Sequence, residues 1–412
     1  MRLPNPAPLI AIACGGTGGH LFPGLALAEA MRGCGAECHL FVSMKDVDRQ
    51  ALDLWDGAGG SVETLPAVGW DGRRPWAFLG GLWRAWCRVR LVFGDRRPDA
   101  VVAMGGFTGV APVVAGLRLG VPVFLHESNA IPGRANRWLA PWVRAAFLGF
   151  PQAAARMRAQ EVRVCGTPVR TGIGPASPAV CREKLGLGPD RTTVLIMGGS
   201  QGARAINRLA VGALECWRAE DLNLQFLHLT GREDEADVRA AYAQHGFRAR
   251  VSAFMPEMEL ALGSADLAIA RAGASSLAEL AAVRLPAILI PYPAAADNHQ
   301  LYNARAYADT GAAWVCEQGT MTSSILAEQV IRLIRRPEER ARMGAALTQW
   351  HRPGAAREMA EAILQMSASG RGVEADEPLS RPARSPGGSS CGERQSWRSL
   401  EPSEHCQGGS GR

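Results

Sequence analysis

The stretch Val194-Leu-Ile-Met-Gly-Gly-Ser-Gln-Gly-Ala-Arg-Ala-Ile-Asn207 predicts a buried strand, a glycine-rich turn and the start of a helix. Its first four residues are continuously apolar, which is typical of a strand covered on both faces. Gly198, Gly199 and Gly202 permit positive φ angles and let another group approach the backbone closely. A helix that starts after such a turn directs free N–H groups and a positive dipole end at its surroundings, and phosphate is the usual occupant. The apolar residues of this helix recur every three or four positions: Ile206, Leu209, Ala210, Ala213, Leu214 and Trp217.

The first half of the chain repeats this construction. Leu9–Cys14 is an apolar run, Gly15-Gly16-Thr17-Gly18-Gly19-His20 is the turn, and a helix is expected from about Leu21–Pro23. Two such units roughly 180 residues apart predict two similar α/β domains that face one cleft.

Strand-like runs alternate with helical patterns through both halves, which predicts doubly wound parallel sheets. Ligands of such sheets bind at the carboxyl ends of the strands. A boundary is expected near Gly166-Thr167-Pro168, and Gly172–Pro178 has the composition of a linker. The other expected strands are Cys38–Val42, Ala100–Met104, Val121–Leu125, Ala145–Leu148, Val162–Cys165, Leu224–Leu229, Arg250–Phe254, Leu267–Ala270, Ala287–Ile290 and Ala313–Cys316.

The composition is that of a globular protein. The 412 residues are 47% apolar and 20% charged, enough for two or three domains with proper cores. A net charge of +6 permits an anionic ligand or membrane face, but no basic run with interleaved aromatics suggests a nucleic-acid partner. The ten cysteines form no C-x-x-C pair and no His pair has zinc spacing, so we expect buried cysteines in a reducing cytoplasm. We also expect no metal site and no cofactor. No apolar run is long enough for a membrane-spanning helix.

Two segments stand out in composition. Between Trp70 and Arg90, a helical face is expected to carry Trp76, Leu79, Trp83 and Trp86 beside several arginines. Such a segment suits a bilayer interface, but it also suits an ordinary helix packed on its own sheet with its arginines in solvent. From 367 to 412, 22 of 46 residues are Ser, Gly or Pro, which predicts a disordered tail.

The first glycine turn does not match a dinucleotide-binding motif. Leu21 stands where the third glycine of that motif would fall, and no P-loop motif occurs anywhere, which disfavours a nicotinamide-dependent oxidoreductase. His20 ends this turn at the expected cleft. It suits a general base acting on a hydroxyl, or equally a structural histidine.

Three further polar groups follow expected strands. His126-Glu127-Ser128-Asn129 suits acid–base work or the fastening of a loop by hydrogen bonds. Glu279 sits early in a helix, where it suits a ribose diol or the helix dipole. Asp297, Asn298, His299 and Gln300 together suit a polyhydroxylated ligand or a solvated loop.

Taken as a set, the motifs of this chain resemble the MurG family of bacterial N-acetylglucosaminyltransferases. The resemblance runs in register over about 9–366 and does not include the tail. It is carried by GGTGGH (15–20), MGGFTG (104–109), HESNAIPGRANR (126–137), GTPVR (166–170), GGSQGARAIN (198–207), RAGASSLAEL (271–280) and DNHQLYNA (297–304).

The resemblance implies an inverting hexosyltransferase of the GT-B fold. It would move N-acetylglucosamine from UDP-N-acetylglucosamine to the C4 hydroxyl of the N-acetylmuramoyl-peptide of undecaprenyl-linked lipid I. The product is lipid II of peptidoglycan synthesis, which serves cell shape and division. Residues 1–166, completed by a helix in 351–366, would bind the acceptor and the membrane, and 167–350 would bind the UDP-sugar.

The resemblance also implies roles for individual residues. His20 is the candidate general base, and Thr17, Gly18 and Gly19 would lie against the donor and the diphosphates. Asn129 would touch the transferred sugar, Glu279 the ribose, and His299 and Gln300 the sugar hydroxyls. Residues expected to hold the nucleotide, or to line that site, are Arg170, Ser200, Met255, Ala274, Ser275, Ser276, Leu277 and Ala278.

The implied location is the cytoplasmic side of the inner membrane, as a peripheral protein, with proteins of wall synthesis and division as further partners. Two alternatives stay open. One is a related GT-B glycosyltransferase with another lipid acceptor, such as diacylglycerol. The other is a non-catalytic nucleotide-sugar-binding protein.

Overall fold

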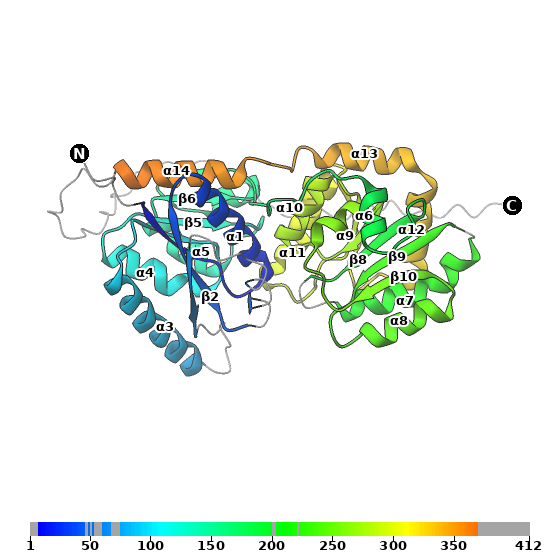
Figure 1. Ribbon diagram of the computed structural model, residues 1–412, viewed down its shortest axis with the longest axis horizontal. Helices are drawn as coiled ribbons and strands as arrows, with labels where there is room; N and C mark the ends of the chain where they lie inside the picture. Colours follow the sequence, from blue (N-terminus) through cyan, green and yellow to red (C-terminus); the bar gives the residue numbers. More distant parts are fainter. Residues whose placement is uncertain are drawn as a thin grey trace, which may run out of the picture. The chain divides into compact units, whose positions relative to one another are not determined.

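The computed structural model describes residues 7–45, 48–49, 52, 60–66, 75–199, 203–220 and 222–369 (Figure 1). Two parallel sheets organise this part of the chain. We call the first sheet and its covering helices the first lobe, and the second sheet and its helices the second lobe. Ser200 and Gly202, Trp70, and nearly all of the expected tail lie outside the described residues.

The sheet of the first lobe has seven strands, and every pairing in it is parallel. In spatial order they are β3 (Gly60–Leu65), β2 (Glu37–Ser43), β1 (Leu9–Ala13), β4 (Ala100–Ala103), β5 (Val123–Glu127), β6 (Ala145–Leu148) and β7 (Val162–Val164). Along β1, Ile10 and Ile12 enter one core cluster while Ala11 and Ala13 enter another. Side chains of a strand alternate between faces, so this sheet is covered on both sides.

Helices cover both faces of this first sheet. One face is packed by α1 (Gly18–Gly33) and α14 (Ala355–Ser369), and the other by α3 (Pro75–Asp95), α4 (Val110–Arg118) and α5 (Arg134–Leu139). The last described helix, α14, packs against α1 and contributes Met359 and Ile363 to the core of the first lobe.

The second sheet has six parallel strands and the same two-sided cover. Their order is β10 (Arg248–Ser252), β9 (Leu224–Leu229), β8 (Thr192–Met197), β11 (Leu267–Ala270), β12 (Ala287–Leu289) and β13 (Ala313–Val315). One face is packed by α9 (Met258–Ser264), α10 (Ala274–Val283) and α11 (His299–Asp309). The other is packed by α7 (Arg204–Ala219), α8 (Glu235–Gln244) and α12 (Ser323–Arg335), while α6 (Pro178–Lys184) lies against α9 and α13 (Pro337–Leu347) against α12.

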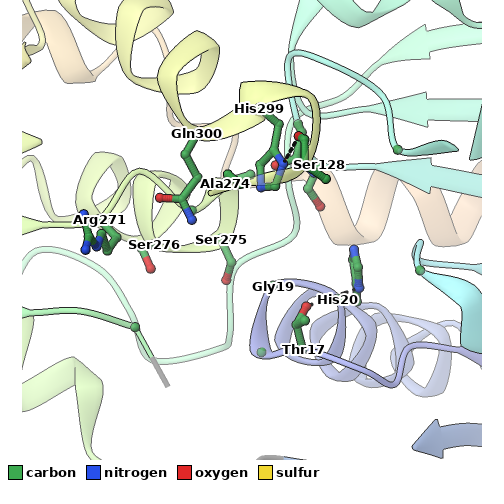
Figure 2. Close-up of a pocket in the computed structure, with 18 of the residues that line it drawn as sticks. Thr17, Gly19, His20, Ser128, Arg271, Ala274, Ser275, Ser276, His299 and Gln300 are labelled. Atoms are coloured by element: carbon green, nitrogen blue, oxygen red, sulfur yellow. Dashed lines mark hydrogen bonds between the residues drawn. The ribbon is translucent and has the colours of Figure 1, made fainter. Parts of the chain in front are cut away.

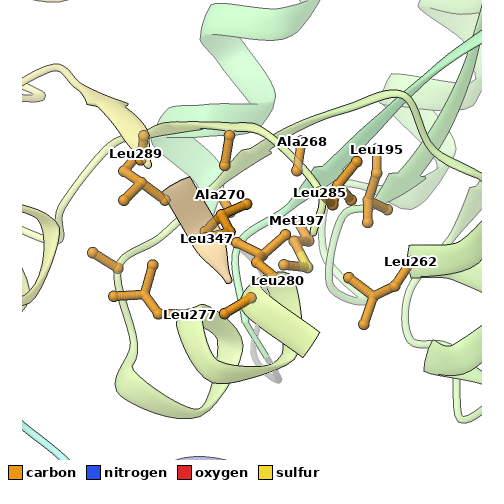
Figure 3. Packing of buried hydrophobic residues seen from close by; sticks show 14 of the residues in the cluster. Leu195, Met197, Leu262, Ala268, Ala270, Leu277, Leu280, Leu285, Leu289 and Leu347 are labelled. Atoms are coloured by element: carbon orange, nitrogen blue, oxygen red, sulfur yellow. The ribbon is translucent and has the colours of Figure 1, made fainter. Parts of the chain in front are cut away.

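Figure 3 shows the core between this sheet and α10. Leu195 and Met197 of β8 and Ala268 and Ala270 of β11 meet side chains of α10. The expected fold class of two doubly wound parallel sheets is therefore confirmed.

Besides shifts of one or two residues at strand ends, as in β5 and β10, four expectations about single elements need correction. The strand β3 was not expected, because its sequence lacks an apolar pattern. Helix α1 begins at Gly18 and not near Leu21, so Gly18, Gly19 and His20 form its first turn. The expected tail began at residue 367, but α14 continues to Ser369 with Ser367 buried.

The fourth correction concerns the tryptophan-rich helix α3. Trp76, Leu79 and Trp83 are 81%, 49% and 67% exposed, so this part of the helical face does not pack on the sheet. Trp86, which was expected on that face, is half-buried because α4 lies beside it and Arg118 covers its ring at 4.6 Å.

Candidate active site

A cleft of about 1080 Å³ is lined by residues from both lobes. The lining segments follow β1, β4 and β5 in the first lobe and β8, β11 and β12 in the second, which are the carboxyl ends of parallel strands. Its volume lies at or slightly above the usual upper limit for a small-ligand site, so the cleft is large for a single small ligand. Figure 2 shows residues of both lobes directed into it.

Most of the site residues expected from the sequence line this cleft. They are Thr17, Gly18, Gly19, His20, Asn129, Arg170, Met255, Ala274, Ser275, Ser276, Glu279, His299 and Gln300. Leu277 and Ala278 do not line it. They lie on the buried side of α10, where Leu277 joins the core of the second lobe (Figure 3).

His20 lies in the first turn of α1 with its ring against a glycine pair. A methyl group at Gly105 would lie 2.9 Å from Cδ2 and Nε2 of His20, and Gly105 and Gly106 have φ of 114° and 73°. Only glycine adopts such φ angles without strain, so the glycine pair allows the backbone to approach the His20 ring closely. Thr17 Oγ1 lies 3.3 Å from Nδ1 of the same ring.

The environment of His20 keeps it neutral. Burial, followed by the positive charge of nearby His299, lowers its pKa to about 4, although Asp48 opposes this effect. A neutral imidazole has a free ring nitrogen that can accept a proton from a hydroxyl group.

The glycine turn before His20 is fastened by residues that the sequence did not single out. A methyl group at Gly15 would lie 2.2 Å from the backbone nitrogen of Ser43 at the end of β2. Asp48 Oδ2 accepts hydrogen bonds from Gly16 N at 2.8 Å and Ser43 N at 2.9 Å, and Lys45 Nζ donates to Gly16 O at 2.7 Å. These contacts follow no motif, so no signal in the sequence pointed to them.

Glu127 fastens the loop after β5. Its carboxylate accepts hydrogen bonds from the backbone N–H groups of Asn129 and Gly133 and from the side-chain amides of Asn129 and Asn136, at 2.8 to 3.0 Å. His126 is fully buried beside Gly166 O, and burial lowers its pKa to about 4. Of the two roles open from the sequence, these contacts support loop fastening.

The second lobe offers the N-terminus of α10 to the cleft. Ser275 and Ser276 lie in its first turn, after the extended residue Gly273, and no acidic residue occupies that turn. A helix end of this kind favours a negatively charged ligand group.

Glu279 and Arg170 form an ion pair at the cleft wall, with Nη2 3.0 Å from Oε1. Burial raises the pKa of Glu279, and Arg170 opposes that rise. The guanidinium of Arg170 also lies 4.2 Å from the ring centre of Phe22 in the first lobe. Arg170 therefore contacts groups of both lobes.

Helix α11 brings His299 and Gln300 to the cleft. Asp297 and Asn298, just before it, both have positive φ angles of about 50°. His299 Nδ1 lies 2.8 Å from Ala296 O, and Gln300 Oε1 accepts a hydrogen bond from Tyr292 N at 3.0 Å.

Arg271 also lines the cleft, although the sequence did not single it out as a site residue. It is 7% exposed, and its hydrogen bonds go to neutral acceptors: the carbonyls of Ile290 and Pro291, and Gln318 Oε1. Burial lowers its pKa, but an arginine stays protonated at physiological pH. Its place directly after the apolar strand β11 was the available signal. With the N-terminus of α10, it makes this part of the cleft favourable for an anion.

The first-lobe side of the cleft is partly apolar. Phe107 meets Phe78 edge-on at 5.2 Å, and Leu82 of α3 and Val110 of α4 lie on the same wall. Helix α3, which contributes Phe78 and Leu82 to this wall, also carries the exposed Trp76 and Trp83. Within the described residues, no group of three or more metal-ligating side chains is found.

Two family models match this chain. The glycosyltransferase family 28 N-terminal domain matches residues 10–148, and the family 28 C-terminal domain matches residues 193–361.

Curated relatives span nearly the same length. A protein of Sorangium cellulosum is 39% identical over 371 residues, covering 88% of this chain and 89% of the relative. A protein of Moorella thermoacetica is 38% identical over 378 residues, covering 88% of this chain and all of the relative. Both are named UDP-N-acetylglucosamine–N-acetylmuramyl-(pentapeptide) pyrophosphoryl-undecaprenol N-acetylglucosamine transferase.

Solved structures of the same family and fold superpose on this chain. MurG of Acinetobacter baumannii superposes with a TM-score of 0.68 at 28% identity, over 88% of this chain and 100% of that one. The UDP-GlcNAc 2-epimerase of Neisseria meningitidis superposes with a TM-score of 0.63 at 13% identity, over 87% and 100% of the two chains, which shows a common fold alone.

Proposed function

This chain belongs to the pyrophosphoryl-undecaprenol N-acetylglucosamine transferases of glycosyltransferase family 28, and from this premise we propose its reaction and the roles of its residues. It is a hexosyltransferase that moves N-acetylglucosamine from UDP-N-acetylglucosamine to the C4 hydroxyl of the lipid I muramoyl-peptide. The product is lipid II of peptidoglycan synthesis.

The observation that best supports this reaction is that one cleft contains both a possible base and a possible anion-binding group. His20, a neutral histidine, comes from the first lobe, and the open N-terminus of α10 comes from the second. Sugar transfer with inversion needs a base on the acceptor side and stabilisation of the leaving diphosphate on the donor side.

We assign the chemical step as follows. His20 takes the proton of the C4 hydroxyl while its oxygen forms a bond to the anomeric carbon from the face opposite UDP. The bond from that carbon to the diphosphate oxygen breaks, and UDP leaves with the electron pair. The N-termini of α1 and α10, with Arg271, stabilise the negative charge that develops there.

The donor would lie against the second lobe. Ser275 and Ser276 would face the phosphates, Glu279 the ribose, and His299 and Gln300 the sugar hydroxyls. Met255 would lie beside the base, and Ser200 would belong to the same phosphate site. Residues 167–350 are thus proposed as the donor domain, and 1–166 with 351–366 as the acceptor domain.

The membrane side is proposed from α3. A helix with exposed Trp76, Leu79 and Trp83 beside exposed Arg84 and other arginines suits the interface of an anionic leaflet. We propose that this leaflet is the cytoplasmic side of the inner membrane, which a nucleotide-sugar donor supports. None of the described helices combines the length and apolar character needed to cross a bilayer.

The direct test is transfer of radiolabelled sugar from UDP-N-acetylglucosamine to a lipid I analogue, with diacylglycerol as the control acceptor. Labelling of the lipid I analogue alone is expected. Labelling of diacylglycerol would contradict the proposed acceptor, and binding of UDP-sugar without turnover would support a non-catalytic role.

A further inference from the structure

Asn303 is a fully buried polar residue on the helix that carries His299 and Gln300. It lies one turn after Gln300 in α11, is 0% exposed, and does not line the cleft. Buried side-chain amides are hydrogen-bonded because an unmade bond is costly there. The partners of this amide therefore indicate its role.

The amide of Asn303 connects the two lobes. Its Oδ1 accepts a hydrogen bond from Ala130 N at 2.8 Å, and its Nδ2 donates to Asn129 Oδ1 at 3.0 Å and to Ala272 O at 3.1 Å. The two first-lobe partners, Asn129 and Ala130, are adjacent in the chain and follow β5. Ala272 follows β11 in the second lobe, two residues before α10.

The orientation of this amide is determined by backbone groups. A backbone N–H can only donate and a backbone carbonyl can only accept, so Ala130 N requires the oxygen and Ala272 O requires the nitrogen. Asn129 must then present its own oxygen to Asn303, and its nitrogen donates to Glu127 Oε1 at 3.0 Å.

Asn129 is thus held from both ends while it lines the cleft. Each end of its amide has one further hydrogen-bonding position, a lone pair on Oδ1 and a hydrogen on Nδ2. Asn303 and Glu127 therefore determine the directions in which Asn129 can meet a ligand.

A second contact between the lobes is weaker. Asp297 pairs with Arg134 at 3.3 Å and Arg137 at 2.7 Å, but these arginine side chains are 69% and 38% exposed. Exposed ion pairs are screened by solvent and contribute little. The buried bonds of Asn303 are the stronger constraint.

We propose that Asn303 is a positioning residue for sugar transfer, because its amide holds Asn129 and Ala130 of the first lobe against the second lobe. This rests on the proposed function. These bonds would fix the distance between the donor, bound at α10 and α11, and His20 of the first lobe. Asn303 itself touches neither substrate.

Two variants of the full chain separate the bonds of this amide. Asn303→Asp keeps an acceptor for Ala130 N but sets an oxygen against Asn129 Oδ1 and Ala272 O. Asn303→Ala removes all three bonds. Arg305→Ala is the matched control, because Arg305 lies on the same helix, is exposed, and pairs with Glu317 on the surface.

Each variant is measured for UDP affinity, for kcat and KM of transfer, and for hydrogen exchange of the Ala130 amide. Both Asn303 variants are expected to lose about 10- to 100-fold in kcat while UDP affinity stays within about twofold. The Ala130 amide should exchange faster in Asn303→Ala than in Asn303→Asp. Arg305→Ala should match the unmodified chain in all three.

Unchanged kcat in both Asn303 variants would overturn the proposal. Equal loss of UDP affinity and turnover would also overturn it, because that pattern indicates a general loss of structure. No transfer by the unmodified chain would instead overturn the proposed function, so the two failures are distinguishable.

Discussion

At the scale of single residues, His20 combines a low pKa with a place beside the expected diphosphate. Its pKa of about 4 reflects burial above all, so the ring is neutral at physiological pH. A bound diphosphate would raise this pKa through its negative charge, as Asp48 already does. The base would then be strongest when substrates are bound.

Replacing His20 by Ala is expected to lower kcat of transfer by about 10²–10⁴, as for loss of a general base. UDP affinity should change little, because the His20 ring is neutral and the ribose and sugar contacts are proposed in the second lobe. For the unmodified chain, kcat/KM should stay level as pH falls from 8 to near 5 and decline as it approaches 4.

His245→Ala is the matched control, since His245 ends α8 outside the cleft. Steady-state kinetics and calorimetric UDP titration measure both variants. Full turnover in His20→Ala would remove this residue from the mechanism.

Site residues that follow a strand could be predicted from the sequence more readily than residues whose hydrogen-bond partners are distant along the chain. Ser275 and His299 follow buried strands, so their place at the cleft could be anticipated. Asp48 and Asn303 could not be anticipated, because the site segments that they hold, at Gly16 and Ala130, lie 32 and 173 residues away. Leu277 was assigned to the site with its neighbours, but the turn of the helix directs it into the core.

At the scale of elements, strands with an apolar run were predictable, and β3, which has none, was missed. β1 and β8 are continuously apolar and were expected, whereas β3 is an edge strand with Val62 40% exposed. The start of α1 was misplaced because Pro23 suggested a first turn, and the helix begins one turn earlier.

The packing of α1 on β1 gives a prediction for Gly24. A methyl group there would lie 2.3 Å from Cys14 Cβ. Gly24→Ala should therefore destabilise the fold by about 1–3 kcal/mol through overpacking. Gly33→Ala, in the same helix with open space around it, should stabilise by up to about 1 kcal/mol.

Urea unfolding measures both glycine variants. A destabilisation of equal size in the two would contradict the packing argument, because only Gly24 has a close neighbour.

The exposed face of α3 gives a prediction for membrane binding. Replacing Trp76 and Trp83 together by Ser should weaken binding to anionic vesicles at least about 10-fold. In the unmodified chain, each ring is expected to move out of water and into the bilayer interface, and the double variant loses this gain. The melting temperature should hardly change, since both rings are exposed.

Vesicle sedimentation measures this binding, and Ile325→Ser, at an exposed position of α12 in the second lobe, is the control. Equal binding by all three proteins would assign the membrane contact to another surface.

At the scale of the whole molecule, buried histidines in both lobes couple stability to pH. Burial lowers the pKa of His126 to about 4 and of His228 to about 3, against about 6.5 in an unfolded chain. Between these values the unfolded chain binds more protons than the folded one. Stability is therefore complete above about pH 6.5 and is lost as pH falls toward 4.

His228→Gln should flatten this dependence, with a change of a few kcal/mol between pH 6.5 and 4. Chemical unfolding at a series of pH values measures it. A slope identical to that of the parent chain would mean that His228 titrates normally in the fold.

The helix α14 has a consequence for how this protein is made. The first lobe begins the chain, yet Met359 and Ile363 of α14 belong to its core. A ribosome releases α14 only after the second lobe has emerged, and domains begin to fold as they leave the ribosome. The second lobe can therefore complete its core before the first. The lobe that is synthesised first can therefore be the last to complete its core. Until α14 has been synthesised, the face of α1 that packs against α14 stays uncovered.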